Sequence, residues 1–235
     1  METRILDKYL IPCYSKCMKL FFDVLQRIKY KLGFDRKSFI LRHVKYNKCT
    51  SILEIGVFNG NFAERLLKTA SKSYPDSKIH YLGVDLFKEG LTQDKYAAEV
   101  SLYPKTLMEV QSRLSNLDNT KVELIQGDST KVLPLIPKHL KFDLIHIDGG
   151  HSFETVKSDW KNVMEIIGPR TVVFFDDYTN RRGITKGGFG VKEVVDSIDP
   201  SKFQVKLSKN RDYFWKTYGL LSLKIAMVTV RNKQK

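Results

Sequence analysis

The sequence predicts an α/β protein built on a doubly wound, mainly parallel sheet, and two observations carry this prediction. Short apolar runs alternate with helical patterns from Ser51 to Ile198, which is the order of elements in a parallel sheet. Acids such as Asp85 and Asp148 follow these runs directly. Because parallel strands share one carboxyl edge, such acids gather at the crevice where open α/β sheets bind ligands. The length of 235 residues suits one such domain with appendages.

Residues 1–49 precede this alternation and are expected to form a basic helical extension, with the main domain spanning residues 50–235. Apolar residues between Tyr14 and Leu32 recur at the spacing of one helix face, and a second short helix is expected from Lys37 to Tyr46. A basic amphipathic helix can pack on its own domain, on a membrane surface or on a partner. We expect packing on the domain, and a homo-oligomer formed through these helices is left open.

The net charge of +14 is concentrated at the two ends of the chain. Residues 1–50 and 201–235 each carry an excess of eight positive charges, so residues 51–200 come to about −2. Basic ends can attract nucleic acid or an anionic membrane, although a solvated basic surface is the simpler interpretation.

Other whole-chain features indicate a cytoplasmic protein. No segment offers the roughly 18 to 20 uncharged residues of a membrane span, and the N-terminus lacks the apolar stretch of a signal peptide. The three cysteines, Cys13, Cys17 and Cys49, contain no CxxC pair. Neither a disulfide framework nor a zinc cluster is therefore indicated.

The first strand is expected at Ser51–Ile55 and leads into a turn that contains Gly56 and Gly60, before a helical pattern at residues 62–69. Glycine lets the backbone pass close to a ligand. The spacing E-x-G-x-x-x-G, which begins at Glu54, is neither the GxGxxG nor the GK[ST] fingerprint, so alone it is weak evidence for a nucleotide site.

The second and third strands add further polar groups to the same edge. The second, residues 78–84, ends at Asp85, whose distance from the glycine turn suits hydrogen bonds to the hydroxyls of a ribose. The third, residues 122–125, is followed by the turn Gly127-Asp128-Ser129, which could surround an adenine ring. Together these features favour an adenosine-type ligand, whereas a plain strand-end acid capping a loop is the alternative.

A strand–helix–strand unit follows at residues 142–178. The apolar run 142–147 ends at Asp148, and the run 171–175 ends at Asp176 and Asp177. Three carboxylates at one sheet edge are costly unless they hold a cation or another positive ligand. We therefore expect a divalent-metal site, although acids that merely cap the following helices are the alternative.

Between these two runs, His151 is expected to lie beside the acids, and residues 153–167 to form a helix. Ser152 is expected to cap this helix. Asp159 and Trp160 are assigned to the helix surface and to packing, respectively.

The remaining elements complete the predicted sheet and its surroundings. Two helices are expected within residues 87–118, where they could form a lid or an oligomer contact, and a mobile loop is expected at residues 179–190. A short helix should span residues 191–198. Strands at residues 203–207 and 221–230 are close enough in sequence to favour an antiparallel pair at one edge.

These motifs resemble those of the Rossmann-type S-adenosylmethionine-dependent methyltransferases over about residues 50–231. The resemblance rests on Glu54-x-Gly56-x-x-x-Gly60, on Asp85, on Gly127-Asp128-Ser129 and on Asp148. It implies a Rossmann-like, seven-stranded, mainly parallel sheet with a C-terminal antiparallel hairpin. The segments IDGGH (147–151) and FDDY (175–178) are similar to those of the metal-dependent macrocin O-methyltransferase and cephalosporin-hydroxylase-like group.

The resemblance also implies a division of roles among the site residues. Asp148, Asp176 and Asp177 would be Mg²⁺ ligands, which their hard oxygen atoms suit. His151 would act with Asp148 in catalysis, as the base that takes a proton from the acceptor hydroxyl. The cofactor, S-adenosylmethionine, would be bound by a larger set: Glu54, Gly56, Gly60, Asp85, Gly127, Asp128, Ser129 and Asp148.

The expected function is Mg²⁺-dependent O-methylation of a small hydroxylated molecule of the sugar or natural-product type. RNA methylation is the main alternative because the ends are basic, but the Lys-Asp-Lys-Glu set expected of ribose methyltransferases has no counterpart after Asp148. The asparagine-proline-proline signature of amino-group methyltransferases that act on bases is absent too. A non-catalytic nucleoside-binding module is the third possibility, and the complete motifs count against it.

Overall fold

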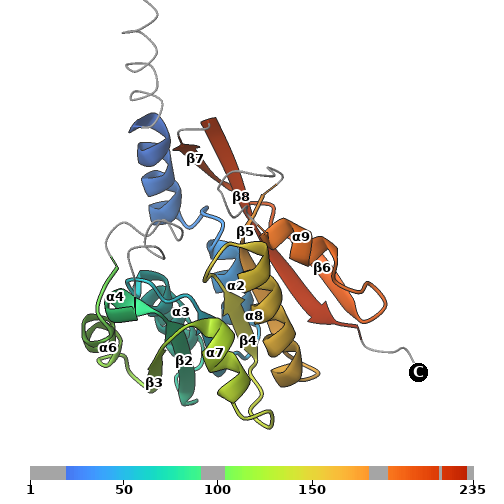
Figure 1. The fold of residues 1–235 in the computed structure, drawn as a ribbon. Coiled ribbons are helices and arrows are strands. Elements are labelled where there is room, and N and C mark those ends of the chain that lie inside the picture. Colours follow the sequence, from blue (N-terminus) through green and yellow to red (C-terminus); the bar gives the residue numbers. More distant parts are fainter. Residues whose placement is uncertain (1–19, 91–103, 180–189, 217–218, 232–235) are drawn as a thin grey trace, which may run out of the picture.

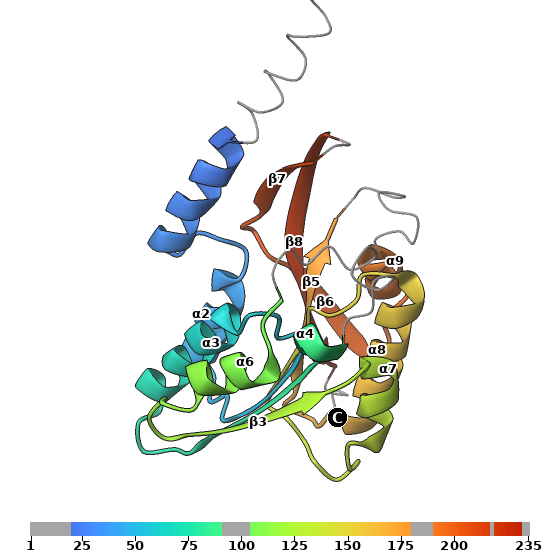
Figure 2. The same cartoon turned by 60° about the vertical axis from the view of Figure 1, so that its left-hand side comes forward.

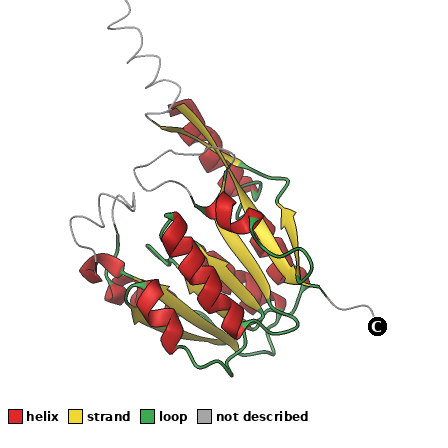
Figure 3. Ribbon diagram, turned by 45° about the vertical axis from the view of Figure 1, so that its right-hand side comes forward, coloured by secondary structure: helices red, strands yellow, loops and turns green. Residues whose placement is uncertain are grey.

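The computed structural model describes residues 20–90, 104–179, 190–216 and 219–231, and it confirms the predicted α/β fold (Figure 1). Helices cover both faces of one mainly parallel sheet (Figure 3). The strands are β1 (Ser51–Ile55), β2 (Ile79–Asp85), β3 (Thr120–Gln126), β4 (Leu144–Ile147), β5 (Val172–Tyr178), β6 (Phe203–Leu207), β7 (Asp212–Lys216) and β8 (Gly219–Val230). The labelled helices are α2 (Ser38–Tyr46), α3 (Asn61–Ser73), α4 (Phe87–Gly90), α6 (Leu107–Leu114), α7 (Ser129–Val132), η1 (Leu133–Leu135), α8 (Phe153–Ile166) and α9 (Val191–Asp196).

The strand order β3-β2-β1-β4-β5-β8-β6 places the switch point of the sheet between β1 and β4. The strands from β3 to β5 are parallel, and β8 is antiparallel to both β5 and β6. Ile55 and Ile147 are register partners at the carboxyl ends of β1 and β4. The residues that follow these two strands therefore meet at the crevice where such sheets bind ligands.

The sheet has eight strands rather than the seven expected, because β7 pairs with β8. The antiparallel pairing of residues 203–207 with 221–230 is confirmed. The aromatic run Tyr213–Trp215 inside β7 is only three residues long, and polar residues precede it, so it carries too little periodicity to predict a strand.

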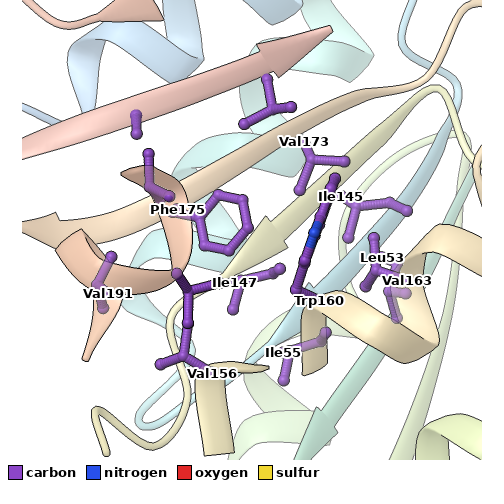
Figure 4. Close-up of a cluster of buried hydrophobic side chains, with 14 of the residues drawn as sticks. Leu53, Ile55, Ile145, Ile147, Val156, Trp160, Val163, Val173, Phe175 and Val191 are labelled. Atoms are coloured by element: carbon purple, nitrogen blue, oxygen red, sulfur yellow. The ribbon is translucent and has the colours of Figure 1, made fainter. Parts of the chain in front are cut away.

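Alternating side chains of the strands supply two hydrophobic cores, one on each face of the sheet. On one face Leu53, Ile145 and Phe175 pack against Val156 and Trp160 of α8 (Figure 4). On the other face the neighbouring strand residues pack against α2, α3 and α6. Asp159 is fully buried on α8, so its assignment to the helix surface is wrong, whereas the packing role of Trp160 is confirmed.

Ser152 caps α8 as expected, because its hydroxyl accepts a hydrogen bond from the Thr155 amide at 3.2 Å.

The N-terminal segment also lies against the domain. Ile40 and Val44 of α2 are fully buried in the core on the α3 side. The boundary proposed at residue 50 stays a prediction.

Residues 20–32 are helical and stand beside β7, where the β7–β8 pair projects from the sheet (Figure 2). The side chain of Gln26 donates to the Tyr213 carbonyl at 3.0 Å, and Lys29 Nζ donates to the Arg211 carbonyl at 2.8 Å. Packing of this segment on its own domain, as the sequence analysis expected, is therefore seen for the part of it that the structure describes.

Some predictions lie wholly or partly outside the described residues. These include the first of the two helices expected within residues 87–118, most of the loop expected at residues 179–190, Cys13 and Cys17. Within the described ranges, no helix has both the length and the apolar character that a membrane crossing requires.

Candidate functional site

The glycine turn after β1 lies directly against the end of β4. Gly56 has a φ of +89°, which favours glycine, and a side chain here would place its Cβ 2.1 Å from the Asp148 carbonyl oxygen. The Asp148 amide donates to the Ile55 carbonyl at 2.7 Å, which ties the two strand ends together. Gly60, with a φ of +74°, precedes α3 and completes the turn. The two glycines chosen from the sequence are therefore required by close approach and by backbone conformation.

Asp85 holds this turn in place. Its Oδ2 accepts the amides of Val57 and Phe58, both at 2.7 Å, and its Oδ1 accepts the amide of Phe87 at 2.7 Å. A carboxylate has about four acceptor positions, so these three donors leave room for about one more. The predicted contact with a ribose is thus limited to a single hydroxyl unless the turn changes.

Glu54 is buried on β1 in a polar contact that the sequence analysis did not anticipate. The Tyr81 hydroxyl donates to Glu54 Oε2 at 2.5 Å, and His146 Nδ1 lies 3.0 Å from Oε1. Burial, followed by the nearby Glu54 carboxylate, raises the pKa of Tyr81 well above its ordinary value. Histidine at position 146 interrupts the apolar run of β4, which was the available sequence signal for this partner.

The third predicted segment lies at the same edge, beside β2. The Gly127 amide donates to the Asp85 carbonyl at 2.8 Å. Asp128 caps α7, of which Ser129 is the first residue, by accepting the amide and hydroxyl of Thr130 at 3.1 and 2.7 Å. The structure thus brings the predicted cofactor-binding residues to one edge of the sheet, and their contact with a cofactor stays a prediction.

A break in β5 turns two consecutive acids toward one partner. Successive side chains of a regular strand point to opposite faces. The register with β8 shifts between Phe175 and Tyr178, and Asp177 has a φ of +56°, which is uncommon outside glycine. As a result, Asp176 and Asp177 both contact Arg36. Such irregularities are enriched at functional sites.

Arg36, which lies two residues before α2, is the main partner of these acids. Its Nε and Nη2 donate to the two oxygens of Asp176 at 2.5 and 3.1 Å, and Nη2 also donates to Asp177 Oδ1 at 2.7 Å. Its Nη1 donates to Asp212 Oδ2 of β7 at 3.0 Å. Burial works to lower the pKa of Arg36, but Asp176 and Asp177 raise it well above its ordinary value.

Lys37 reaches the third acid. Its Nζ donates to Asp148 Oδ2 at 2.6 Å and lies 3.2 Å from Asp176 Oδ2 and 4.6 Å from the centre of the Phe62 ring. Burial, followed by the negative charge of Asp176, raises the pKa of Asp148 to about 6 although Lys37 opposes this change. For Asp176, burial acts to raise the pKa, but Arg36 and Lys37 hold it well below its usual range.

His151 lies beside the acids, as predicted. Its Nε2 is 2.6 Å from Asp177 Oδ2. Ligating atoms of Asp148, His151 and Asp177 all lie within 4.8 Å of one another, and so do those of His146, Asp148 and Asp176. The predicted metal and catalytic residues therefore form one cluster, to which His146, Arg36 and Lys37 must be added.

A cavity of about 660 Å³ opens beside this cluster. Its lining includes Glu54 and Gly56 from the cofactor turn, and Lys37 and Asp148 from the charged cluster. The helix at residues 20–32 contributes further lining residues. A space of this size is typical of small-molecule sites.

Sequence comparison identifies the family of the chain. A family described as a methyltransferase domain matches residues 53–178, which include the glycine turn and the acids and histidines of the charged cluster but not Arg36 and Lys37. The chain belongs to this methyltransferase family. The prediction of a Rossmann-type S-adenosylmethionine-dependent methyltransferase is thereby confirmed for family and fold, and the macrocin-like group is compatible with it. No curated protein sequence matches the chain.

Solved structures share the fold of this methyltransferase. The O-methyltransferase TomG from Streptomyces achromogenes, in complex with SAM, is 17% identical, with a TM-score of 0.56 over 85% of this chain and 80% of that one. An O-methyltransferase from Bacillus cereus, in complex with SAH, is 16% identical, with a TM-score of 0.57 and the same coverage. The SAH-bound methyltransferase PaMTH1 from Podospora anserina is 14% identical, with a TM-score of 0.55 over 99% of this chain and 97% of that one.

Arg36 and Lys37 are the cationic residues of this methyltransferase site that sequence analysis missed, besides His146. The convergence of three acids implied a positive partner, and a metal ion was chosen for that role. The sequence offered only a weak signal for the actual partner, an adjacent Arg-Lys pair at the start of a predicted helix. Nothing in their spacing from Asp176, 140 residues away from Arg36, indicates contact.

Proposed function

We propose that this methyltransferase transfers the methyl group of S-adenosylmethionine to a hydroxyl oxygen of a small molecule. The observation that carries the proposal is the meeting of two features at one switch point. The glycine turn at Gly56 lies against Asp148, and Asp148 belongs to the charged cluster beside His151. The neighbouring cavity of about 660 Å³ extends from this turn to the cluster, which favours a small acceptor.

The cofactor would lie along the carboxyl ends of β1, β2 and β3. Gly56 permits close approach of the backbone, Asp85 has about one acceptor position for a ribose hydroxyl, and Asp128 and Ser129 lie at the adenine end. Glu54, fixed by Tyr81 and His146, would shape the methionine end. This placement directs the sulfonium methyl group toward the cavity.

His151 is the proposed general base. The acceptor oxygen forms a bond to the methyl carbon, the carbon–sulfur bond breaks, and the hydroxyl proton passes to His151. The products are the methyl ether and S-adenosylhomocysteine. The tautomer that donates from Nε2 to Asp177 presents Nδ1 as the base, as in other His–carboxylate pairs. Positioning of the oxygen in line with the sulfur supplies much of the remaining acceleration.

Magnesium dependence is the expectation of the sequence analysis. Asp148, Asp176 and Asp177 are the right type of ligand for Mg²⁺. However, their oxygens already contact Arg36, Lys37 and His151, so the cluster as it stands does not fit the ion. The chemistry above is therefore derived from the residues of the chain alone.

The test is methyl transfer from methyl-labelled S-adenosylmethionine to a panel of hydroxylated sugars and natural-product alcohols, followed by mass spectrometry. We expect His151→Gln to lower turnover by about 10²- to 10⁴-fold, with unchanged affinity for S-adenosylhomocysteine. His139→Gln, which changes an exposed histidine, is the matched control. Equal turnover of the His151 variant and the wild type would contradict the role of His151 as general base.

Two alternatives predict different results. A non-catalytic module would bind S-adenosylhomocysteine and transfer no methyl group to any acceptor. An RNA methyltransferase would label RNA in preference to small alcohols, and its RNA affinity would fall steeply as the salt concentration rises.

A further inference from the structure

We infer that Arg36 and Lys37 take the place of a divalent metal ion in this site, so that methyl transfer needs no metal. The inference rests on the proposed function for its catalytic part, but not for its metal-binding part. It concerns two named groups: the carboxylate cluster (Asp148, Asp176 and Asp177) and the cation pair (Arg36 and Lys37).

The contacts of the carboxylate oxygens are the first argument. A metal ion requires acceptor lone pairs that point to one place. Both oxygens of Asp176 receive Arg36, and both oxygens of Asp177 are engaged, one by Arg36 and one by His151. Lys37 occupies Asp148 Oδ2. Five of the six oxygens therefore already contact a basic side chain, and the Asp177 amide adds a further donor to Asp176 Oδ1 at 2.7 Å.

The position of Lys37 Nζ is the second argument. The ammonium lies between two acids at the carboxyl ends of neighbouring strands, 2.6 Å from Asp148 Oδ2 and 3.2 Å from Asp176 Oδ2. An ion that bridged these two oxygens would need the same space. A divalent cation placed next to the Lys37 ammonium would also be repelled strongly by it in a buried site. Lys37 must therefore leave before a metal can bind.

The third argument is that the cation pair is held by the fold itself. The Arg36 side chain, 11% exposed, is anchored from the opposite side by Asp212 of β7. The Asp212 carboxylate also accepts the Arg36 backbone amide at 3.3 Å. Lys37 in turn lies over the Phe62 ring. Removal of one partner of a buried ion pair is strongly destabilising, so the pair is not readily displaced.

The chemical consequence concerns the acceptor oxygen. Loss of its proton to His151 leaves negative charge on that oxygen, which a bound metal would otherwise stabilise. Lys37 lines the cavity beside Asp148 and carries a positive charge that is fixed before the reaction. Such a preorganised charge can stabilise the developing anion without a metal.

Metal binding is the first measurement, and it needs no acceptor. Mn²⁺ is titrated into the full chain loaded with S-adenosylhomocysteine, and bound ion is counted by electron paramagnetic resonance. We expect no stoichiometric binding to the wild type at millimolar Mn²⁺. Lys37→Met should gain one Mn²⁺ per chain, because Asp148 and Asp176 lose their shared cation. Lys138→Met removes an exposed lysine and should match the wild type. Stoichiometric Mn²⁺ on the wild type, or no gain in the Lys37 variant, would overturn the inference.

Methyl transfer is the second measurement. We expect EDTA to leave wild-type turnover unchanged. In EDTA, the turnover of Lys37→Met should be at least tenfold below that of the wild type. Lys37→Arg, which keeps the charge, should exclude Mn²⁺ and covers the case in which Lys37→Met does not fold. If EDTA abolished the turnover of the wild type and added Mg²⁺ restored it, the inference would be overturned. If no acceptor is methylated under any condition, the proposed function fails, while the Mn²⁺ titrations still decide whether the cation pair replaces the metal.

Discussion

A methyl group added at Gly56 provides a sharp test of how the cofactor turn is built. In Gly56→Ala the new Cβ would lie 2.1 Å from the carbonyl oxygen and 2.4 Å from the carbonyl carbon of Asp148. Both are backbone atoms of a segment tied to β1 by the Asp148 amide, so they cannot rotate away. The same change at Gly60 is a matched control, because its φ is also positive but its nearest neighbour is a side-chain atom, Val110 Cγ1 at 3.1 Å, rather than backbone at 2.1 Å.

The expected cost follows from these two environments. A left-handed conformation costs an alanine about 1–2 kcal/mol, and this term is shared by both variants. Overpacking against the backbone adds about 1–3 kcal/mol at Gly56 only. We therefore expect Gly60→Ala to lose about 1–2 kcal/mol and Gly56→Ala about 2–5 kcal/mol of unfolding free energy.

Urea denaturation followed by circular dichroism measures these free energies, and calorimetry with S-adenosylhomocysteine measures binding. Gly56→Ala should also bind the ligand at least tenfold more weakly under conditions where it is folded, because the turn and Asp148 must separate. A Gly56 variant as stable as the Gly60 variant would refute the close approach of the two strand ends.

Three further outcomes follow from the charged cluster and from a helix cap. Arg36→Met should lower the unfolding free energy by about 3–5 kcal/mol in urea, and Arg36→Lys should recover only part of it, because an ammonium cannot form the forked contacts. A pKa of about 6 for Asp148 means that the folded state holds this proton more tightly than the unfolded state does. The free energy of unfolding should therefore fall by roughly 3 kcal/mol as the pH rises from about 4 to about 6, and Asp148→Asn should remove this fall. An Asp148→Asn variant with the same pH profile as the wild type would contradict the raised pKa of Asp148. Thr106→Ala should cost about 1 kcal/mol through loss of the capping box with Glu109, and no measurable change would mean that the cap does not form in solution.

The sequence by itself determined the elements of the sheet and the residues at its carboxyl edge. Apolar runs of β1, β2, β4 and β5 are local patterns, and an acid or glycine that directly follows such a run is fixed at the strand end by chain connectivity. For this reason the sequence alone places Gly56, Asp85, Asp148 and the acids after Phe175 at one crevice. The family resemblance then supplied the expected cofactor.

Only the tertiary structure decided how the acids are neutralised. A bulge and a positive φ, which no periodic pattern encodes, turn Asp176 and Asp177 to the same side. Their partner Arg36 is 140 residues away from Asp176 in the chain, and its second anchor, Asp212, lies on the strand that the sequence did not predict. A buried carboxylate requires a positive partner, but long-range packing decides whether that partner is a metal or a side chain. In this methyltransferase the packing of α2 brings Arg36 and Lys37 to that position.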